Sequence, residues 1–269
     1  MKLSGNTVMI TGGATGIGFA FAEAFLNAGN EVIILSRRKE KLEEAQRKYP
    51  SLHIKECDIT DGSARDSLVS WAIGNFGGFN VIVNNAGIQK EVDLRRGLSD
   101  IVRGESEIRL NLEAPIYLTA LLIPYLVNKE NAVIINITSA LGVVPVAGMP
   151  LYCAAKAGMH IFTKCLRQQL LQTGVRVFEV LPPSLQTGPE MQEQNVQESA
   201  PSQVKTLSAS DYVASVMLSL QNDELEIMSS DLKNASGSQL QRTFESKNAM
   251  WNPAAAGSAP GTGTASYGS

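Results

Sequence analysis

The sequence predicts one α/β domain built on a doubly wound parallel sheet with helices on both faces. Three observations lead to this prediction. Short runs of β-branched and apolar residues alternate with longer segments of helical period along most of the 269 residues. Several of these runs are apolar almost throughout, as expected for parallel strands covered on both faces. The chain is 44% hydrophobic and 18% charged, which is enough apolar material for one large core.

Six strands are expected, each a short run rich in valine and isoleucine. In chain order they span residues 7–10, 31–35, 52–57, 80–84, 132–138 and 175–181, with LEIM at 225–228 a candidate for a seventh. The first helix follows strand 7–10 and places Ile17, Phe21, Phe25 and Ala28 on one apolar stripe. Further helices are expected over residues 62–76, 105–128, 152–173 and 209–221, with a short one near 238–250.

The predicted domain covers residues 1–251 and includes a polar, loop-like segment at about 186–210 that we expect to meet the substrate. Residues 252–269 carry no charge and consist mainly of Ala, Gly, Ser, Thr and Pro. Such a segment buries too little apolar surface to offset its ordering entropy. It is therefore predicted to be a flexible tail.

Charge and cysteine content argue against several classes of protein. A net charge of −3 and a pI near 5.6 disfavour a nucleic-acid-binding protein, which usually presents a basic face. The three cysteines, Cys57, Cys153 and Cys165, show no CxxC spacing, and there are only two histidines. We therefore expect reduced thiols, with neither a disulfide framework nor a metal site.

The first residues, MKLSGNTVMITGG, reach strand and glycine signals too early for a secretory signal peptide. The most apolar stretch, at 116–127, is shorter than the roughly 18 residues that a membrane span needs, and Pro124 interrupts it. The expected location is therefore the cytoplasm, with no membrane partner.

A glycine-rich turn, TGGATGIG at 11–18, lies between the first strand and the first helix. The missing side chains at Gly12, Gly16 and Gly18 allow backbone N–H groups and the helix dipole to approach a pyrophosphate. The alternative is an ordinary glycine-rich turn. The strand before, the helix after and a second strand about 20 residues on favour dinucleotide binding.

The second strand ends in Ser36, Arg37 and Arg38, where NAD-binding units usually carry an acid for the ribose hydroxyls. A hydroxyl followed by two guanidinium groups favours the 2′-phosphate of NADP(H) over NAD(H), because arginine can bind phosphate through two hydrogen bonds. The alternative is that both arginines are solvated at a helix start. Asp58, just after the third strand, is expected to touch the adenine edge, or else to be a turn or N-cap aspartate.

The remaining features form one set in chain order. NNAG at 84–87 follows the fourth strand, and Asn111 lies in the next helix. Ser139 closes the fifth strand, and Tyr152 and Lys156 follow it by 13 and 17 residues. With TGGATGIG, this set resembles the classical short-chain dehydrogenases/reductases over residues 5–230, closest to a little-characterised bacterial oxidoreductase branch. The resemblance implies a Rossmann fold and hydride transfer between a nicotinamide and a carbonyl/alcohol pair.

The residues themselves indicate the chemistry. Four helix positions rotate by about 40° and rise by about 6 Å, so Tyr152 and Lys156 share a face. A phenol has a pKa near 10, and a neighbouring ammonium, together with the positive charge of an oxidised nicotinamide, is expected to lower it. Tyr152 can then exchange a proton with the substrate oxygen, while Ser139 supports the developing alkoxide. The resemblance implies that Lys156 also binds the nicotinamide ribose and that Asn111 holds a water linking Lys156 to solvent.

The resemblance also assigns cofactor contacts by position. They are Gly12, Thr15, Gly16, Ile17, Gly18, Ser36, Arg37, Arg38, Asp58, Ile59, Asn85, Ala86, Gly87, Tyr152, Lys156, Leu185 and Thr187. Asn84 is expected to be structural and to tie strands together. Pro183 replaces the glycine usual in the family, which fixes φ, removes an N–H and changes the expected loop path. His160, one helical turn after Lys156, is interpreted as a packing residue or an oligomer contact.

The segment 140–149, with Leu185, Pro189 and Met191, is expected to surround the reacting carbon. Its apolar character favours a small carbonyl or alcohol substrate with a hydrophobic body. Loops near this site are, however, equally apolar in relatives with other substrates. The resemblance implies a homodimer or homotetramer formed through helices 105–128 and 152–173.

Three other functions fit these residues less well. The main alternative is a catalytically silent NADP(H)-binding regulator or scaffold. Lyase or epimerase chemistry on the same fold usually needs a larger C-terminal domain, whereas only about 80 residues follow Thr187 here. A serine hydrolase is disfavoured because no G-x-S-x-G sequence follows a strand.

Overall fold

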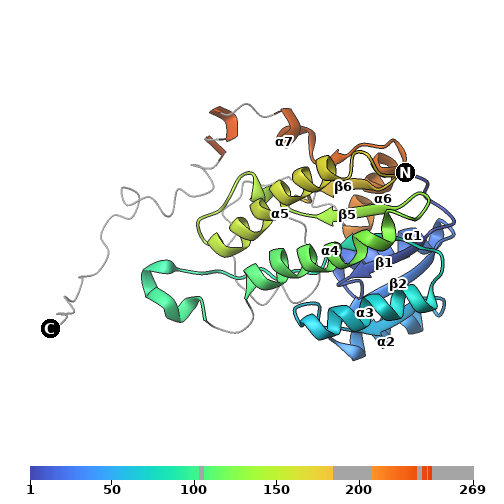
Figure 1. The fold of residues 1–269 in the computed structure, drawn as a ribbon. Helices are drawn as coiled ribbons and strands as arrows, with labels where there is room; N and C mark the ends of the chain where they lie inside the picture. The colour runs from blue at the N-terminus through green and yellow to red at the C-terminus, as the bar shows by residue number, and fades with distance from the viewer. Residues whose placement is uncertain (103–105, 184–207, 235–237, 241, 244–269) are drawn as a thin grey trace, which may run out of the picture.

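A computed structural model describes residues 1–102, 106–183, 208–234, 238–240 and 242–243 of the chain. They form one domain around a seven-stranded parallel sheet of order β3-β2-β1-β4-β5-β6-β7 (Figure 1). The strands are β1 (Thr7–Thr11), β2 (Glu31–Ser36), β3 (His53–Glu56), β4 (Phe79–Asn84), β5 (Val133–Ile137), β6 (Arg176–Val180) and β7 (Glu226–Ile227). The six predicted strands are confirmed, each within one residue at either end, and LEIM supplies the seventh.

Helices cover both faces of the sheet (Figure 1). One face packs against α1 (Gly16–Asn27), α2 (Lys39–Lys48) and α6 (Ala209–Gln221). The other packs against α3 (Gly62–Asn75), α4 (Ala114–Leu126) and α5 (Pro150–Gln169). Successive strand residues divide between the two apolar clusters: Val8 and Ile10 join the first, and Met9 joins the second. The predicted doubly wound fold is confirmed.

The helix α2 was not predicted. Its sequence, KEKLEEAQRK, buries only Leu42 and Ala45, so the apolar stripe is too narrow to stand out in the sequence. The short elements η1 (Leu94–Asp100), η3 (Ala140–Gly142) and α7 (Ser230–Asn234) were not predicted either.

Two predicted helices differ in their bounds. The predicted helix 105–128 is a π-helical turn, η2 (Arg109–Glu113), that leads into α4, and Pro124 lies within α4. The predicted helix 152–173 is α5, which begins at Pro150 because proline suits the first helical position, where no N–H bond is needed. Of the helix near 238–250, residues 238–240 and 242–243 are helical. Residues 244–250, most of the 186–210 segment and the 252–269 tail lie outside the described residues.

The strand order places a topological switch between β1 and β4. From β1 the chain builds β2 and β3 to one side, and β4 to β7 then follow on the other. The segments that follow β1 and β4 run to opposite sides of the sheet, and a crevice is left between the carboxyl ends of these two strands. The Thr11 hydroxyl holds this point together, because it donates to Val83 O at 3.3 Å and accepts from the backbone N–H groups of Asn85 and Ala86 at 2.9 and 3.0 Å.

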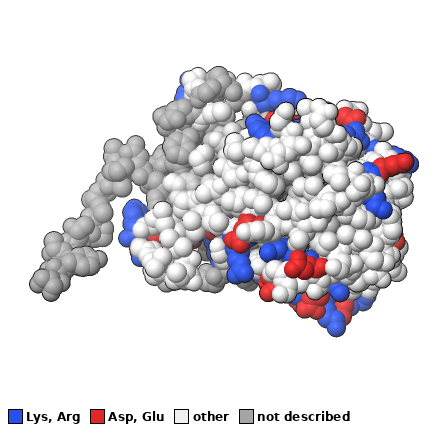
Figure 2. All heavy atoms as spheres, viewed as in Figure 1, with Lys and Arg blue, Asp and Glu red and all other residues white. Residues whose placement is uncertain are grey.

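The surface over α4 and α5 carries few charged side chains (Figure 2). Three large apolar side chains are exposed there: Tyr117 by 51%, Leu121 by 39% and Ile161 by 58%. Among the described helices, none combines the length and apolar character needed to cross a membrane.

Candidate active site

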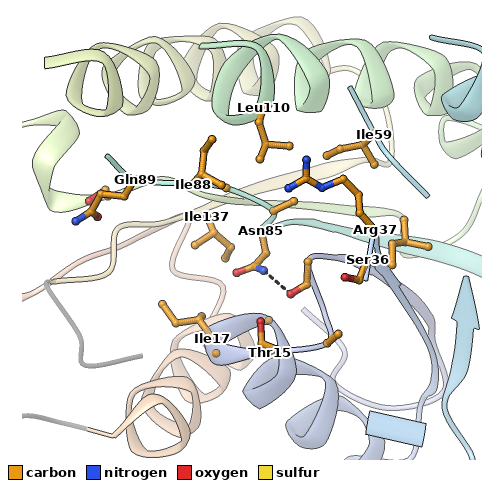
Figure 3. Close-up of a pocket in the computed structure, with 18 of the residues that line it drawn as sticks. Thr15, Ile17, Ser36, Arg37, Ile59, Asn85, Ile88, Gln89, Leu110 and Ile137 are labelled. Atoms are coloured by element: carbon orange, nitrogen blue, oxygen red, sulfur yellow. Dashed lines mark hydrogen bonds between the residues drawn. The ribbon is translucent and has the colours of Figure 1, made fainter. Parts of the chain in front are cut away.

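A cavity of about 730 Å³ lies at the carboxyl edge of the sheet, where β1 and β4 diverge (Figure 3). Most of the site residues predicted from the sequence line it. They are Gly12, Thr15, Gly16, Ile17, Gly18, Ser36, Arg37, Arg38, Asp58, Ile59, Asn85, Ala86, Gly87, Ser139, Tyr152 and Lys156. Asn111 contacts this lining from behind, through Ile88. Leu185 and Thr187 lie outside the described residues.

The glycine-rich turn has no room for side chains. Gly12 and Gly16 have φ values of 64° and 57°, which disfavour residues with a Cβ. A Cβ on Gly18 would lie 2.3 Å from the Gly12 carbonyl oxygen, and one on Gly12 would lie 2.9 Å from Ala86 Cα. The turn therefore presents bare backbone at the N-terminus of α1, which fits the pyrophosphate of a dinucleotide.

The NNAG segment braces this turn. Asn85 Nδ2 donates to the carbonyl oxygens of Thr11 and Gly12 at 2.9 and 3.2 Å. A dashed line in Figure 3 marks one hydrogen bond of Asn85. Asn84 Nδ2 donates instead to Thr119 Oγ1 and Asn136 Oδ1, at 3.0 and 2.8 Å. The first asparagine thus ties β4 to β5 and α4, which confirms the structural role predicted for it.

The end of β2 forms a basic wall of the cavity. Arg37 extends into the cavity from β2 (Figure 3). The Arg38 guanidinium reaches Thr15 Oγ1 at 3.5 Å, and its backbone N–H donates to Ser36 Oγ at 3.1 Å. Lys41, which was missed, also lines the cavity from the first turn of α2. Its position a few residues after the end of β2, in the same SRRKEKL segment as Arg37 and Arg38, was the available signal.

Asp58 lines the cavity but is held as a turn residue. Its Oδ1 accepts hydrogen bonds from the backbone N–H and the hydroxyl of Thr60 at 2.9 and 2.7 Å. Burial opposes ionisation of this carboxyl, but the Thr60 hydrogen bonds outweigh it and lower the Asp58 pKa. The turn alternative is therefore correct for one carboxylate oxygen, and the predicted adenine contact stays a prediction.

Ser139, Tyr152 and Lys156 meet at the end of β5. The Ser139 side chain hydrogen-bonds to the Tyr152 phenol. Lys156 Nζ donates to the Ile137 carbonyl at 2.8 Å and lies 5.7 Å from the centre of the Tyr152 ring. Because Tyr152 and Lys156 occupy successive turns of α5, both side chains reach the same strand end, as the YxxxK spacing predicts.

Burial controls both titrating groups. It raises the pKa of Tyr152, and the hydrogen bond from Ser139 offsets only part of this rise. It lowers the pKa of Lys156 to about 8, since this residue is only 4% exposed. The raised pKa of Tyr152 describes the protein by itself, and the lowering expected from the ammonium together with an oxidised nicotinamide stays a prediction.

Asn111 sits in the π-helical turn and is 1% exposed. Its Nδ2 donates to the Ile88 carbonyl at 2.6 Å, and its Oδ1 accepts from the Ile88 N–H at 2.8 Å. A Cβ on Gly87 would lie 2.7 Å from that Oδ1. Asn111 thus anchors the chain directly after NNAG, while the predicted water relay to Lys156 stays a prediction.

Ile88, Gln89 and Pro182 also line the cavity and were not predicted, whereas Leu141 belongs to the segment 140–149 that was expected near the reacting carbon. Ile88 and Gln89 continue the wall after NNAG (Figure 3), and Leu141 follows Ser139. Pro182 and Pro183 close the side next to β6, and the Pro182 carbonyl accepts from Ala140 N–H at 3.1 Å. These residues follow strand ends, so their position along the chain was the available signal.

The three cysteines are free, as predicted. Within the described ranges, no group of three or more His, Cys, Asp or Glu side chains is arranged to hold a metal ion.

The buried lysine makes stability depend on pH. Below about pH 8 Lys156 is protonated in the folded and unfolded states, so the cost of burying its charge is fully present. Between about pH 8 and its unfolded pKa of 10.5, the folded state has lost the proton and the unfolded state keeps it. Raising the pH therefore stabilises the fold, by close to 1.4 kcal/mol per pH unit at most.

We expect the difference in free energy of unfolding between the wild type and Lys156→Met to rise from about pH 8 upward. Urea unfolding at intervals from pH 7 to 9.5 measures it. Lys164→Met removes an exposed lysine of the same helix and should show no such rise. A flat difference for Lys156→Met would contradict the lowered pKa.

The sequence of the chain is similar to a known family and to proteins from several organisms. Residues 6–199 match the family model for short chain dehydrogenase. The chain is 39% identical over 255 residues to the uncharacterized oxidoreductase DltE of Bacillus subtilis, a match covering 94% of this chain and 100% of that protein. It is 32% identical over 194 residues to human 15-hydroxyprostaglandin dehydrogenase [NAD(+)], covering 68% and 69% of the two chains.

Solved structures share the fold. A short chain dehydrogenase from Burkholderia cenocepacia in complex with NADP superposes with a TM-score of 0.73 at 24% identity, covering 91% of this chain and 99% of that one. A short-chain dehydrogenase from Streptomyces avermitilis gives 0.72 at 25% identity, covering 90% and 92%. The glycine turn, the Ser-Tyr-Lys cluster and these matches agree: the chain belongs to the short-chain dehydrogenase/reductase family and is an NAD(P)-dependent oxidoreductase of its bacterial branch.

Proposed function

We propose that the protein is an NADP(H)-dependent carbonyl reductase, which transfers hydride between the nicotinamide and a carbonyl/alcohol substrate with Tyr152 as acid/base. One observation carries the proposal. Ser139, Tyr152 and Lys156 line the same cavity as the bare glycine turn and the basic wall at Arg37. Hydride chemistry needs an anchored dinucleotide and a proton donor within one cavity, and this arrangement supplies both.

Each of the chain's own residues has a defined part. When bound, the nicotinamide supplies the hydride. Tyr152 donates its phenolic proton to the carbonyl oxygen, and its raised pKa keeps that proton in place before the reaction. Ser139 hydrogen-bonds the same oxygen and stabilises its developing charge. Lys156, protonated below about pH 8, stabilises the phenolate that remains, and Asn111 is the proposed link from Lys156 to solvent.

Preference for NADP(H) rests on the basic wall of the cavity. Ser36, Arg37, Arg38 and Lys41 bring a hydroxyl and three cationic side chains to the end of β2. No carboxylate stands at the strand end itself, where an NAD-binding unit carries one for the ribose. The human relative is named as NAD(+)-dependent and the Burkholderia structure holds NADP, so the relatives differ and the chain's own residues decide the proposal.

Arg37→Ala is expected to raise the Kd for NADPH about 10- to 100-fold and to change the Kd for NADH less than about twofold. The reason is that only NADPH carries the phosphate that the guanidinium would bind. Fluorescence titration of both cofactors measures the change. Lys39→Ala is the matched control, because Lys39 is an exposed neighbour paired with Glu43. Equal weakening of both cofactors by Arg37→Ala would defeat the NADP(H) assignment.

The walls around the reacting end favour a substrate with a hydrophobic body. Ile88, Leu141 and Pro182 line the main cavity next to Ser139. A second cavity of about 350 Å³ shares Leu141 and is lined by side chains such as Pro145 and Val146, most of them apolar. Apolar walls of this kind bind carbonyl compounds with alkyl or aryl groups better than sugar phosphates.

A panel of aldehydes and ketones, assayed in parallel with NADPH and NADH, tests the proposal. We expect turnover that is faster with NADPH and strongest for hydrophobic carbonyl compounds. Tight NADPH binding without turnover of any compound would favour the alternative, a silent NADP(H)-binding regulator. Product analysis that found elimination or epimerisation instead of an alcohol would favour lyase or epimerase chemistry.

We also propose that the protein forms a homodimer or homotetramer through α4 and α5. The exposed apolar side chains on this surface and its low charge support the proposal (Figure 2). Sedimentation equilibrium at micromolar concentration tests it, and a mass of one chain would contradict it.

A further inference from the structure

A fully buried carboxylate lies close to the active site and has no part in the mechanism above. Glu179, on β6, is 0% exposed. Its two oxygens lie 2.9 and 3.0 Å from His160 Nδ1, and the Thr138 hydroxyl donates to Oε1 at 2.7 Å. Burying a carboxylate costs several kcal/mol unless it is paired and hydrogen-bonded, so these contacts are what allow it to stay.

The order of the contacts among Thr138, Glu179 and His160 limits the chemistry that these three residues can perform. The Thr138 hydroxyl donates to the carboxylate, and the imidazole contacts the same carboxylate from α5. A nucleophile needs its hydroxyl beside a base such as imidazole, with the acid behind that base. Here the acid stands in the middle, so Glu179 bridges a strand to a helix. This arrangement serves positioning and not nucleophilic catalysis.

Three successive residues at the end of β5 are each tied to α5. The Ile137 carbonyl accepts from Lys156, Thr138 reaches His160 through Glu179, and Ser139 hydrogen-bonds to Tyr152. The three helix residues, at 152, 156 and 160, are spaced by four and lie on one face of α5. The bonds from Ile137 to Lys156 and from Ser139 to Tyr152 hold the two catalytic side chains of α5. The middle tie, through Glu179, fixes Thr138, which lies between Ile137 and Ser139.

We propose that Thr138, Glu179 and His160 are positioning residues that fix the end of β5 against α5 and so hold Ser139 on the Tyr152 phenol. The inference rests on the proposed function for its kinetic meaning, but the geometry it asserts does not depend on any substrate. If the link through Glu179 is removed, Thr138 and Ala140 keep their backbone bonds to Val180 and Pro182, but the Thr138 side chain no longer joins the end of β5 to α5. Ser139 should then be held less firmly against the phenol. His160 therefore does more than fill space on α5.

The test reads Tyr152 directly. Protein labelled with 3-fluorotyrosine gives one fluorine resonance per tyrosine, and the Tyr152→Phe variant identifies the resonance of Tyr152. Because Ser139 lowers the pKa of this phenol, Thr138→Val and His160→Phe should each raise its titration midpoint. Both substitutions keep a side chain of similar volume and remove its hydrogen bond to the Glu179 carboxylate. Thr138→Ser keeps the hydroxyl and should restore the wild-type midpoint.

Thr163→Val is the matched control. Thr163 is a buried hydroxyl on the same helix, and it accepts from Asn136 Nδ2 at 2.9 Å, further back along the same strand. The Thr163→Val substitution should destabilise the fold about as much as Thr138→Val and leave the titration midpoint of Tyr152 unchanged. An unmoved midpoint in both Thr138→Val and His160→Phe would overturn the inference, and so would an equal shift in Thr163→Val.

Kinetics separate this inference from the proposed function. With a carbonyl compound that the wild type reduces, Thr138→Val should lower kcat about 10-fold or more and leave the Kd for NADPH within about twofold. If the panel yields no substrate, the proposed function fails, while a raised Tyr152 midpoint still supports the positioning role. If turnover is found and Thr138→Val changes neither kcat nor the midpoint, the positioning role fails and the proposed function stands.

Discussion

Tyr152→Phe is expected to lower kcat by about 1,000-fold or more, while the Kd for NADPH stays within about threefold of wild type. The substitution removes only the phenolic oxygen, which is the proton donor in the proposed reaction and the partner of Ser139. The half-buried ring and its contact with the Lys156 ammonium remain. Steady-state reduction of a panel substrate and fluorescence titration of NADPH measure the two quantities.

Tyr125→Phe is the control for this experiment. Tyr125 lies on α4, away from the cavity, and its hydroxyl makes one long contact of 3.4 Å with the Gly77 carbonyl. It should keep wild-type kcat. If Tyr152→Phe kept more than about a tenth of wild-type kcat, the phenol could not be the acid/base, since general acid catalysis alone contributes about 100- to 10,000-fold.

Gly18→Ala should weaken cofactor binding by a large factor, comparable to the loss of kcat expected for Tyr152→Phe. Its Cβ would lie 2.3 Å from the Gly12 carbonyl oxygen and 2.4 Å from Asn85 Nδ2, so the glycine turn and the NNAG segment must both move. The first atom belongs to the backbone, and the second is a side-chain end that is held by its hydrogen bonds to the Thr11 and Gly12 carbonyl oxygens. We expect the Kd for NADPH to rise at least about 100-fold and the free energy of unfolding to fall by about 2 kcal/mol or more.

Gly74→Ala provides the contrast within the same chain. Gly74 lies in α3, and a Cβ there would meet no heavy atom within 4 Å. Alanine in an open helical position should stabilise the fold by about 0.5–1 kcal/mol and leave the Kd for NADPH unchanged. Urea unfolding and NADPH titration of both variants decide the question. A Gly18→Ala protein with wild-type affinity would mean that the turn does not need bare backbone.

Much of the site could be predicted because it lies at strand ends. Ser139 and Asn85 follow apolar strands directly, and in a parallel sheet the carboxyl ends of neighbouring strands meet at one edge. The four-residue spacing of Tyr152 and Lys156 then places two groups on one helix face. These are local rules that relate position in the chain to position in space, so no knowledge of distant contacts is needed.

The rest depends on contacts between distant segments. Glu179 and His160 are 19 residues apart, and nothing in either local pattern marks one as the partner of the other. The raised pKa of Tyr152 in the protein alone could not be predicted, because burial is a property of the packed molecule, whereas the lysine was visible in the sequence. The five-residue π-helical turn around Asn111 was likewise hidden, since RLNLE reads as ordinary helix.

The strand order separates two tasks on either side of the β1–β4 junction. The residues proposed to recognise the cofactor phosphate come from β2 and α2, while the proton-transferring groups come from β5 and α5. Substitutions at 36–41 therefore leave the contacts of Ser139 and Tyr152 untouched, and changes around 139–156 leave the basic wall untouched. We therefore expect that the proposed coenzyme preference and the proposed proton transfer can be altered independently by substitutions within this one domain.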